Sequence, residues 1–204
     1  MIAIINYGSG NIQAIGNIYN QLNIPFIVAE QPDDLKKATK IILPGVGAFD
    51  QAMTELEKSG LRQELEEQIV HIKKPVLGIC VGMQILAKSS EEGVMKGLGW
   101  IDGSVKKFDH SRFIQATHLP HMGWNDVKPV KNNNLFNDVG PGARYYFLHS
   151  YYFSCSRHED VLATTEYGGE FTSAVNSENI YGVQFHPEKS HQMGIQLLKN
   201  FSTL

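Results

Sequence analysis

The stretch Val76-Leu77-Gly78-Ile79-Cys80-Val81-Gly82-Met83-Gln84 decides the fold, because it joins an apolar run to a cysteine flanked by two glycines. Residues 76–79 have the length and composition of a buried strand, and a helix is expected from about Gly82 to Lys88. The glycines permit the tight turn of a nucleophile elbow, whose pattern is Gly-x-nucleophile-x-Gly. The pattern therefore predicts that Cys80 stands at the carboxyl end of a central strand.

Two interpretations of Cys80 are open at this point. At the start of a helix, unpaired backbone N–H groups and the helix dipole favour a reactive thiolate. The carboxyl edge of a parallel sheet is also where ligands bind in open α/β folds. The alternative is a small buried hydrophobic residue, which is common for free cysteine. The second cysteine, Cys155, is expected to be a free thiol as well, since disulfides are rare in cytosolic proteins.

Outside this stretch, apolar runs of strand length alternate with helically spaced apolar residues. The first half predicts strands at 2–5, 25–29 and 41–43, and helices at 12–22, from Asp33 and Asp34, at 48–56 and at 61–72. The second half predicts strands at 104–108, 145–148, 151–155, 161–167, 171–175 and 180–185, and a closing helix at 190–201. This order predicts an α/β, flavodoxin-like doubly wound, mainly parallel sheet with a smaller antiparallel insertion, in a single domain over residues 1–204.

Composition excludes several classes of function. The chain has 204 residues, of which 42% are hydrophobic and 19% charged, with a net charge of −3. No basic run suggests a nucleic-acid surface. Apolar runs such as Ile41 to Leu43 are far shorter than the roughly eighteen residues of a membrane span. The N-terminus lacks the basic region and cleavage site of a signal peptide, so a cytoplasmic protein is expected.

A general base for Cys80 is offered by the stretch Gly182-Val183-Gln184-Phe185-His186-Pro187-Glu188. His186 ends an apolar run, and Pro187 favours an extended backbone before it. His186 can take the thiol proton while Glu188 bonds the other ring nitrogen. The alternative is a strand followed by a helix start, with Pro187 and Glu188 at favoured first-turn positions.

Acyl chemistry on an amide also needs N–H groups that meet the developing oxyanion. The loop Pro44-Gly45-Val46-Gly47-Ala48-Phe49 follows a predicted strand, and its glycines allow a peptide N–H near Val46 or Gly47 to face the site. The second donor would be the N–H of Val81, the residue after the nucleophile. Taken alone, Pro-Gly-x-Gly is better explained as a turn.

Together these segments resemble the class I, or triad-type, glutamine amidotransferases, and more closely the glutaminase subunits of imidazole glycerol phosphate synthase. The resemblance covers nearly the whole chain. It rests on the segments 77–84 and 184–188, which the class shares, and on the more specific segments Asn6 to Asn11, Pro44 to Gly47, Pro120 to Asn125 and Tyr145 to Tyr151. Related chains can carry an asparagine that faces a partner protein at the position where this chain has Ala14. The alanine affects only the detail of that one expected contact.

The resemblance implies hydrolysis of glutamine to glutamate and ammonia by a triad of Cys80, His186 and Glu188. It implies that glutamine is held by Gly47, Gln84, Glu92 and the backbone near Ser150 and Tyr151. It further implies a heterodimer with a (β/α)₈-barrel cyclase, which uses the ammonia to make imidazole glycerol phosphate and AICAR in histidine biosynthesis; a paralogous amination pathway stays open. Residues implied at the partner interface are Asn11, Trp124, Tyr146 and Lys189. Core packing is the alternative for Trp124 and Tyr146, and a solvated surface charge for Lys189.

No metal and no cofactor are expected. His118 and His121 stand three apart and His191 lies near His186, but Pro120 breaks the helix that such spacing usually needs, and nothing completes a ligand set. The loop 6–11 lacks the third glycine of a dinucleotide motif and the Lys-Ser/Thr of a P-loop. Two further functions are weighed: a free-standing cysteine hydrolase, and a non-catalytic partner-binding subunit, which the intact Cys80, His186 and Glu188 disfavour.

Overall fold

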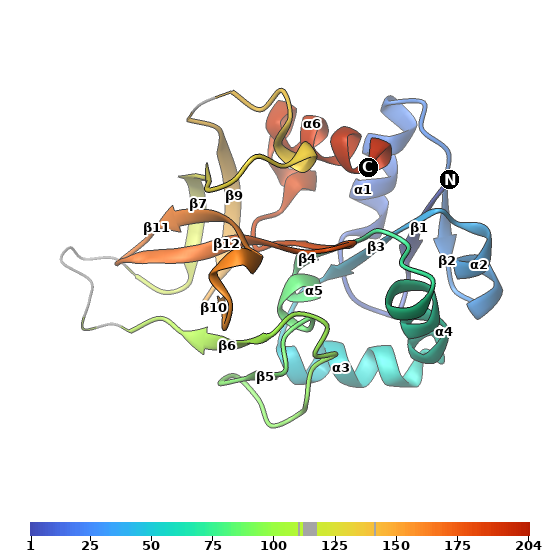
Figure 1. Ribbon diagram of the computed structural model, residues 1–204, viewed down its shortest axis with the longest axis horizontal. Coiled ribbons are helices and arrows are strands. Elements are labelled where there is room, and N and C mark those ends of the chain that lie inside the picture. Colours follow the sequence, from blue (N-terminus) through green and yellow to red (C-terminus); the bar gives the residue numbers. More distant parts are fainter. Residues whose placement is uncertain (110, 112–117, 141) are drawn as a thin grey trace.

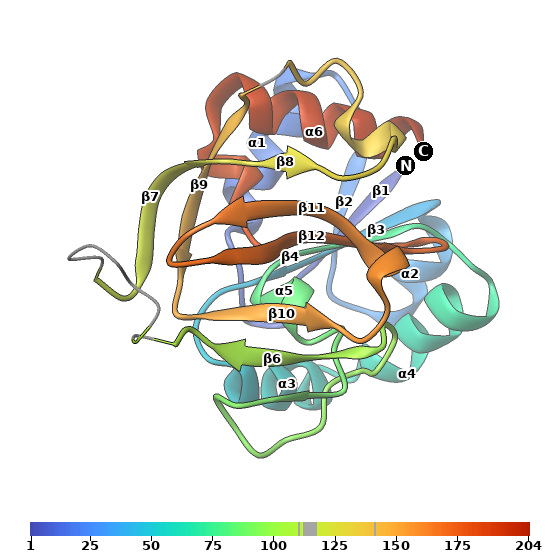
Figure 2. The same ribbon diagram turned by 60° about the vertical axis from the view of Figure 1, so that its left-hand side comes forward.

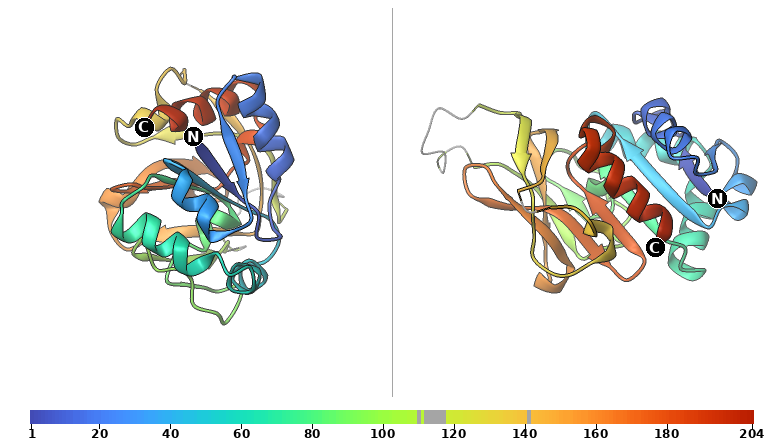
Figure 3. Two further views of the ribbon diagram at one scale, coloured as in Figure 1. Left: turned by 90° about the vertical axis from the view of Figure 1, so that its right-hand side faces the viewer. Right: turned by 90° about the horizontal axis from the view of Figure 1, so that it is seen from above.

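The computed structural model describes residues 1–109, 111, 118–140 and 142–204. A large sheet runs through the middle of the protein, with helices on both of its faces (Figure 1). Helices α1 (Ile12–Gln21) and α6 (His191–Thr203) pack against each other on one face. Helices α3 (Phe49–Lys58) and α4 (Arg62–Glu66) cover the other face, and α2 (Pro32–Lys37) lies beside the outermost strand (Figure 3).

The half of the sheet built from the N-terminal part of the chain is parallel. Its strands stand in the order β2 (Phe26–Ala29), β1 (Ile2–Ile5), β3 (Lys40–Gly45), β4 (Val76–Cys80) and β13 (Ile180–Val183). This is the strand order of flavodoxin-like folds. Strands β1 and β4 are buried along their whole length, because helices cover both faces. The predicted doubly wound parallel sheet is confirmed.

Beyond β13 the sheet continues with mostly antiparallel strands (Figure 2). They are β12 (Glu170–Ser177), β10 (Tyr151–Cys155) and β6 (Gly103–Lys107), with β11 (Val161–Glu166) and β8 (Lys128–Pro129) as a branch from β12 and β5 (Ser89–Ser90) at the edge. A separate antiparallel ribbon consists of β7 (His121–Asp126) and β9 (Arg144–His149). The predicted antiparallel insertion is therefore confirmed, and all of its strands except β7 and β9 belong to the same large sheet as the parallel ones.

Several elements differ from the sequence-based prediction. Strand β3 does not stop at Pro44 but continues through Gly45, which pairs with Cys80. The helix after the elbow, α5 (Val81–Gln84), ends four residues before Lys88. The next carbonyls, those of residues 85–87, accept N–H groups from the distant residues 98, 99 and 101 and not from a further helical turn. The predicted helix 61–72 changes after α4 into a π-helix, η1 (Glu67–His71).

Other elements were not predicted at all. They are strands β5, β7 and β8 and the 3₁₀ helices η3 (Asn134–Phe136) and η4 (His158–Asp160), whereas η5 (Pro187–Lys189) is the helix start that was weighed as the alternative for Pro187 and Glu188. Both cysteines are unpaired. Among the described residues, no helix has the length and apolar character needed to cross a membrane.

Candidate active site

The predicted elbow has the backbone of a sharp corner. Cys80 ends β4 and precedes α5 with φ +55° and ψ −113°, a conformation that side-chain-bearing residues rarely adopt. A Cβ on Gly82 would clash with the Leu43 carbonyl of the neighbouring strand. A Cβ on Gly78 would come within 2.6 Å of the Gly82 carbonyl oxygen. The two glycines therefore allow α5 to pack directly on the strands, and the corner places Cys80 at their carboxyl edge.

His186 and Glu188 lie beside this corner, as the spacing suggested. Parallel pairing of β13 with β4 brings residues 180–183 alongside residues 76–79, so the residues that follow β13 lie near Cys80. The His186 N–H donates to the Tyr146 carbonyl at 2.8 Å, which fixes its backbone. Its ring Nδ1 lies 2.8 Å from Glu188 Oε1. The same carboxylate oxygen accepts a 2.7 Å hydrogen bond from the Asn11 amide.

The electrostatics of this group favour a charged pair. Burial lowers the pKa of His186, but hydrogen bonding and charge interactions with Cys80 and Glu188 outweigh it and raise the pKa to about 10. Burial raises the pKa of Glu188, but the His186 ring and the Asn11 amide bring it below its ordinary value. These contacts therefore favour the state in which the ring holds the proton taken from Cys80 and the carboxylate is ionised.

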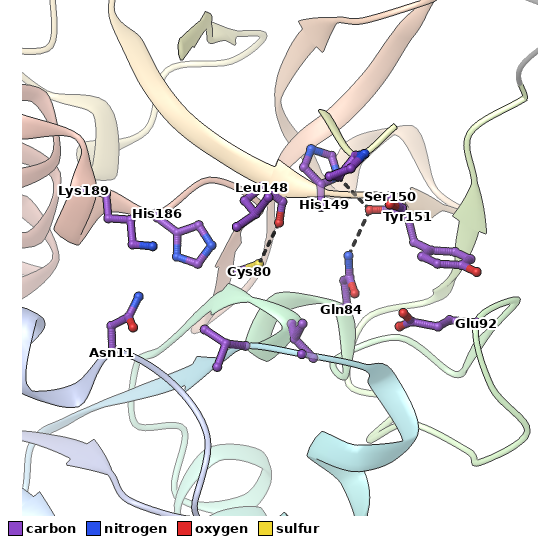
Figure 4. A pocket seen from close by; sticks show the side chains of 14 residues that line it. Asn11, Cys80, Gln84, Glu92, Leu148, His149, Ser150, Tyr151, His186 and Lys189 are labelled. Atoms are coloured by element: carbon purple, nitrogen blue, oxygen red, sulfur yellow. Dashed lines mark hydrogen bonds between the residues drawn. The ribbon is translucent and has the colours of Figure 1, made fainter. Parts of the chain in front are cut away.

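A pocket of about 560 Å³ opens in front of Cys80, within the range typical of small-ligand sites. Figure 4 shows Cys80 between the His186 end of the pocket and the end that holds Gln84, Glu92 and Tyr151. The pocket gathers eleven of the residues named from the sequence: Asn11, Val46, Gly47, Cys80, Val81, Gln84, Glu92, Ser150, Tyr151, His186 and Lys189. Of the triad, only Glu188 stands behind the pocket wall, where it bonds the far side of the His186 ring.

In the loop after β3, Val46 lines the pocket, but its backbone N–H is bound to Ser9. This N–H donates to the Ser9 hydroxyl at 2.9 Å, and that hydroxyl lies 2.9 Å from the Val46 carbonyl oxygen. Gly47, next along, has φ +89°, which suits glycine. The Val46 N–H is thus bound to Ser9 in this conformation and is not available as an oxyanion donor. Val81, the other expected donor, begins α5 directly after Cys80.

The other end of the pocket is fixed by polar contacts. Gln84 donates from Nε2 to the Tyr151 carbonyl and to Gln184 Oε1, both at 3.0 Å. Glu92 Oε2 accepts the Phe49 N–H at 2.8 Å, so this carboxylate also caps the start of α3. Both amide hydrogens of Gln84 are used within the protein, which leaves its carbonyl oxygen as the group for a ligand.

The residues named for a partner interface fall in two places. Asn11 and Lys189 line the pocket at its His186 end (Figure 4). Trp124 and Tyr146 lie outside it, opposite each other on β7 and β9. Trp124 is 38% exposed and stacks on His191, so it is not a core residue. The Lys189 ammonium lies 5.7 Å from the centre of the Tyr146 ring, which joins the two groups.

Among the described residues, four more touch the site and were not singled out from the sequence. Pro120, Leu148 and His149 line the pocket, and the Leu148 carbonyl lies 4.0 Å from the Cys80 sulfur. The amide of Gln184 lies 3.8 Å from the same sulfur. The pairing of neighbouring strands could have identified Gln184. It directly follows Val183, which pairs with Ile79, so it lies level with Cys80 at the end of the neighbouring strand.

The histidines weighed as metal ligands have other contacts. His121 bonds His149, and the His191 ring stacks 5.0 Å from Trp124. In the part of the chain that the structure describes, no group of three or more histidine, cysteine, aspartate or glutamate residues is placed to hold a metal ion.

Comparison of the sequence with known families and proteins agrees with this geometry. Residues 3–203 match the family Glutamine amidotransferase class-I. The chain is 56% identical over 204 residues, covering all of both chains, to imidazole glycerol phosphate synthase subunit HisH of Bdellovibrio bacteriovorus. It is 50% identical, again over the full length of both chains, to the subunit of the same name from Leptospira interrogans.

Solved structures share the fold at low sequence identity. A crystal structure described as glutamine amidotransferase has a TM-score of 0.74 at 15% identity and covers all of both chains. The structure of PurLQS from Thermotoga maritima has a TM-score of 0.70 at 18% identity, over 98% of this chain and 96% of that one. These likenesses extend over both the parallel and the antiparallel strands.

Proposed function

The chain belongs to the class-I glutamine amidotransferases and, within them, to the HisH glutaminase subunits of imidazole glycerol phosphate synthase, and from that premise we propose that it hydrolyses glutamine through Cys80, His186 and Glu188. The observation that carries the proposal is the convergence of these residues at the carboxyl edge of the sheet, where Cys80 and His186 line one pocket and Glu188 Oε1 lies 2.8 Å from the His186 ring. The large sheet shared by both halves of the chain supports one functional domain over residues 1–204.

The reaction begins when the Cys80 thiol gives its proton to His186 and the sulfur attacks the side-chain amide carbon of glutamine. The Val81 N–H at the start of α5 meets the negative charge on the amide oxygen, with a second donor from the loop at Val46 and Gly47. Protonated His186 then gives its proton to the leaving ammonia. Water activated by the same ring hydrolyses the thioester and releases glutamate.

Glutamine fits the pocket with its side chain toward Cys80 and its α-carbon groups toward Gln84. The carbonyl oxygen of Gln84 and the carboxylate of Glu92 accept from the α-ammonium group, and the backbone near Ser150 and Tyr151 binds the α-carboxylate. Gly47 borders the substrate side chain. No cofactor or metal takes part in these steps, since the thiol, ring and N–H groups supply nucleophile, acid–base and electrophilic functions.

The partner face is the outer side of the β7–β9 ribbon. Residues at alternate positions of paired strands share one face, and here these are Met122 opposite Leu148 and Trp124 opposite Tyr146. Met122 is 65% exposed and Leu148 and Trp124 are each 38% exposed. Such an apolar patch beside a pocket supports docking of another protein. We take this partner to be a (β/α)₈-barrel cyclase that makes imidazole glycerol phosphate and AICAR in histidine biosynthesis.

Ammonia must reach that partner without meeting water, because ammonium has no lone pair for attack. The docking face adjoins the His186 end of the pocket through Lys189, so ammonia released at Cys80 leaves toward the partner. We place this coupled reaction in the cytoplasm.

The proposal is tested by measuring glutamine hydrolysis by the chain alone and with the cyclase carrying its own ligand. We expect at least about tenfold stimulation by the liganded cyclase, in the range of ordinary coupling free energies. The physical reason is that the Val46 N–H is bound to Ser9 until the partner reorients the loop. Equal rates with and without the cyclase would refute the coupling, and no hydrolysis under either condition would refute the activity.

Substituting Ser9 by alanine tests the role of this hydrogen bond. Ser9→Ala removes the acceptor of the Val46 N–H and the donor to its carbonyl. The Val46 N–H then turns more readily toward the pocket, and we expect hydrolysis by the isolated chain to rise about two- to tenfold, the effect of losing the one hydrogen bond that holds this N–H. Steady-state assays of released glutamate measure this, with Ser202→Ala, at an exposed helix end, as the control. An unchanged or lower rate would mean that Ser9 does not hold the loop back.

A further inference from the structure

Gln184 is a fully buried glutamine that contacts the reacting sulfur and has no part in the triad. Its Nε2 donates to the Cys80 sulfur at 3.8 Å. Its Oε1 accepts from Gln84 at 3.0 Å, and its backbone N–H donates to the Ser173 carbonyl at 2.9 Å. Because both ends of the side-chain amide are bound, the N–H that faces the sulfur cannot turn away. An N–H group interacts more strongly with a negatively charged sulfur than with a thiol.

The contact continues outward as a chain of buried hydrogen bonds. Gln84 and the His149 ring both donate to the Tyr151 carbonyl, at 3.0 and 2.7 Å. The other ring nitrogen of His149 lies 3.0 Å from Nδ1 of His121. The far nitrogen of His121 lies 3.2 Å from the Asn125 amide nitrogen. The chain thus runs from β7, through the wall of the glutamine pocket, to the Cys80 sulfur.

The direction of every bond in this chain is determined by its ends. The Tyr151 carbonyl can only accept and the Asn125 amide nitrogen can only donate. His149 therefore carries its proton on Nδ1, and His121 donates from Nδ1 to His149 Nε2. Both rings must be neutral for this arrangement, and burial among aromatic rings lowers the pKa of His121 to about 4 and that of His149 to about 3.

The surroundings hold both rings in place. His121 stacks between Tyr167, at 3.9 Å, and Phe147, at 4.6 Å between ring centres. His149 packs against Phe108 at 5.4 Å. A buried polar chain whose members are all bound is rigid, whereas breaking one link leaves a buried group without a partner. The chain is therefore suited to fixing the position of Gln84 and Gln184.

We propose that Gln184 is a further catalytic residue, whose side-chain N–H stabilises the negatively charged sulfur of Cys80. His121 and His149 are positioning residues, which hold Gln184 in place through Gln84. When the Cys80 proton moves to His186, the electron pair stays on sulfur, where the Gln184 N–H faces it. This inference rests on the proposed function, because it takes Cys80 as the nucleophile.

The test is the rate at which iodoacetamide alkylates Cys80, followed by mass spectrometry over a range of pH. Gln184→Met keeps the length of the side chain and removes the donor. We expect alkylation near neutral pH to be about three- to tenfold slower, the effect of one hydrogen bond, and the rising limb of the pH profile to move to higher pH. Burial and the charge of Asp160 raise the pKa of Cys155 to about 12, so this second thiol does not interfere.

The control is Gln68→Met, the same change at another buried glutamine, whose Nε2 donates to Glu64 and not to the site. It should alkylate at the wild-type rate. Loss of rate in both variants would attribute the effect to general loosening of the structure and overturn the inference. An unchanged rate for Gln184→Met also overturns the role of Gln184 but leaves the proposed function standing. Failure to label Cys80 in the wild-type chain would overturn the proposed function itself.

A pair of substitutions at His149 tests the positioning role. His149→Phe keeps a ring in the aromatic surroundings and removes both hydrogen bonds. We expect it to slow alkylation about as much as Gln184→Met and to raise the KM for glutamine, since Gln84 loses its fixed place. His149→Asn retains a donor near the position of Nδ1 and should restore most of the rate. Equal behaviour of the two variants would overturn the positioning role.

Discussion

Replacing Cys80 by alanine is expected to lower glutamine hydrolysis by about 10⁴-fold or more, because no other described side chain can attack the amide carbon from this position. Synthesis from added ammonium salts by the complex with the cyclase should continue, since the cyclase then receives ammonia without the glutaminase. The measurement compares both activities of one purified complex, with glutamate release and product formation followed separately.

The matched control is Cys155→Ala, the same substitution at the other free cysteine. Cys155 ends β10 outside the pocket, and it should keep both activities. If Cys80→Ala retains glutamine hydrolysis, the nucleophile lies elsewhere. If it loses synthesis from ammonium as well, although the complex still assembles, Cys80 acts in more than ammonia release.

The parts of the site that lie close together in sequence were predictable. Glycine spacing around Cys80 prescribes the corner, because a side chain at position 82 has no room beside the Leu43 carbonyl. His186 and Glu188 are separated by one residue, so their contact depends on a single short turn. The parallel half of the sheet followed from uninterrupted apolar runs, which are typical of strands covered on both faces.

The parts that depend on distant segments were not predictable in the same way. Helix α5 ends at Gln84 because residues 98–101 return to bond the carbonyls that a longer helix would use. Strand β7 is paired with β9 although residues 127–143 lie between them, and only that pairing separates an inner face with His121 and His149 from an outer face with Trp124. The Ser9 to Val46 contact likewise joins loops after two different strands.

Substituting Glu188 by glutamine is expected to reduce kcat for glutamine hydrolysis by up to about 10⁴-fold, the loss found when the carboxylate of a catalytic triad loses its charge. Glu188 Oε1 accepts from both the His186 ring and Asn11, while Oε2 is buried and has no partner among the described residues. A glutamine whose oxygen takes the place of Oε1 keeps both hydrogen bonds, removes the charge and places its NH2 group at the position of Oε2.

The sign of the accompanying pH effect follows from the pKa of His186. Burial opposes the charge on this ring, and the Glu188 carboxylate is one of the groups that raise its pKa to about 10. Without the carboxylate the pKa falls, the ring loses its proton at lower pH, and the proton donor for ammonia disappears earlier. The alkaline limb of the kcat/KM profile should therefore move to lower pH. Glu30→Gln is the control, since Glu30 accepts a 2.7 Å bond from Asn6 on the surface. A profile that keeps its alkaline limb in Glu188→Gln would show that this carboxylate does not hold the charge on His186.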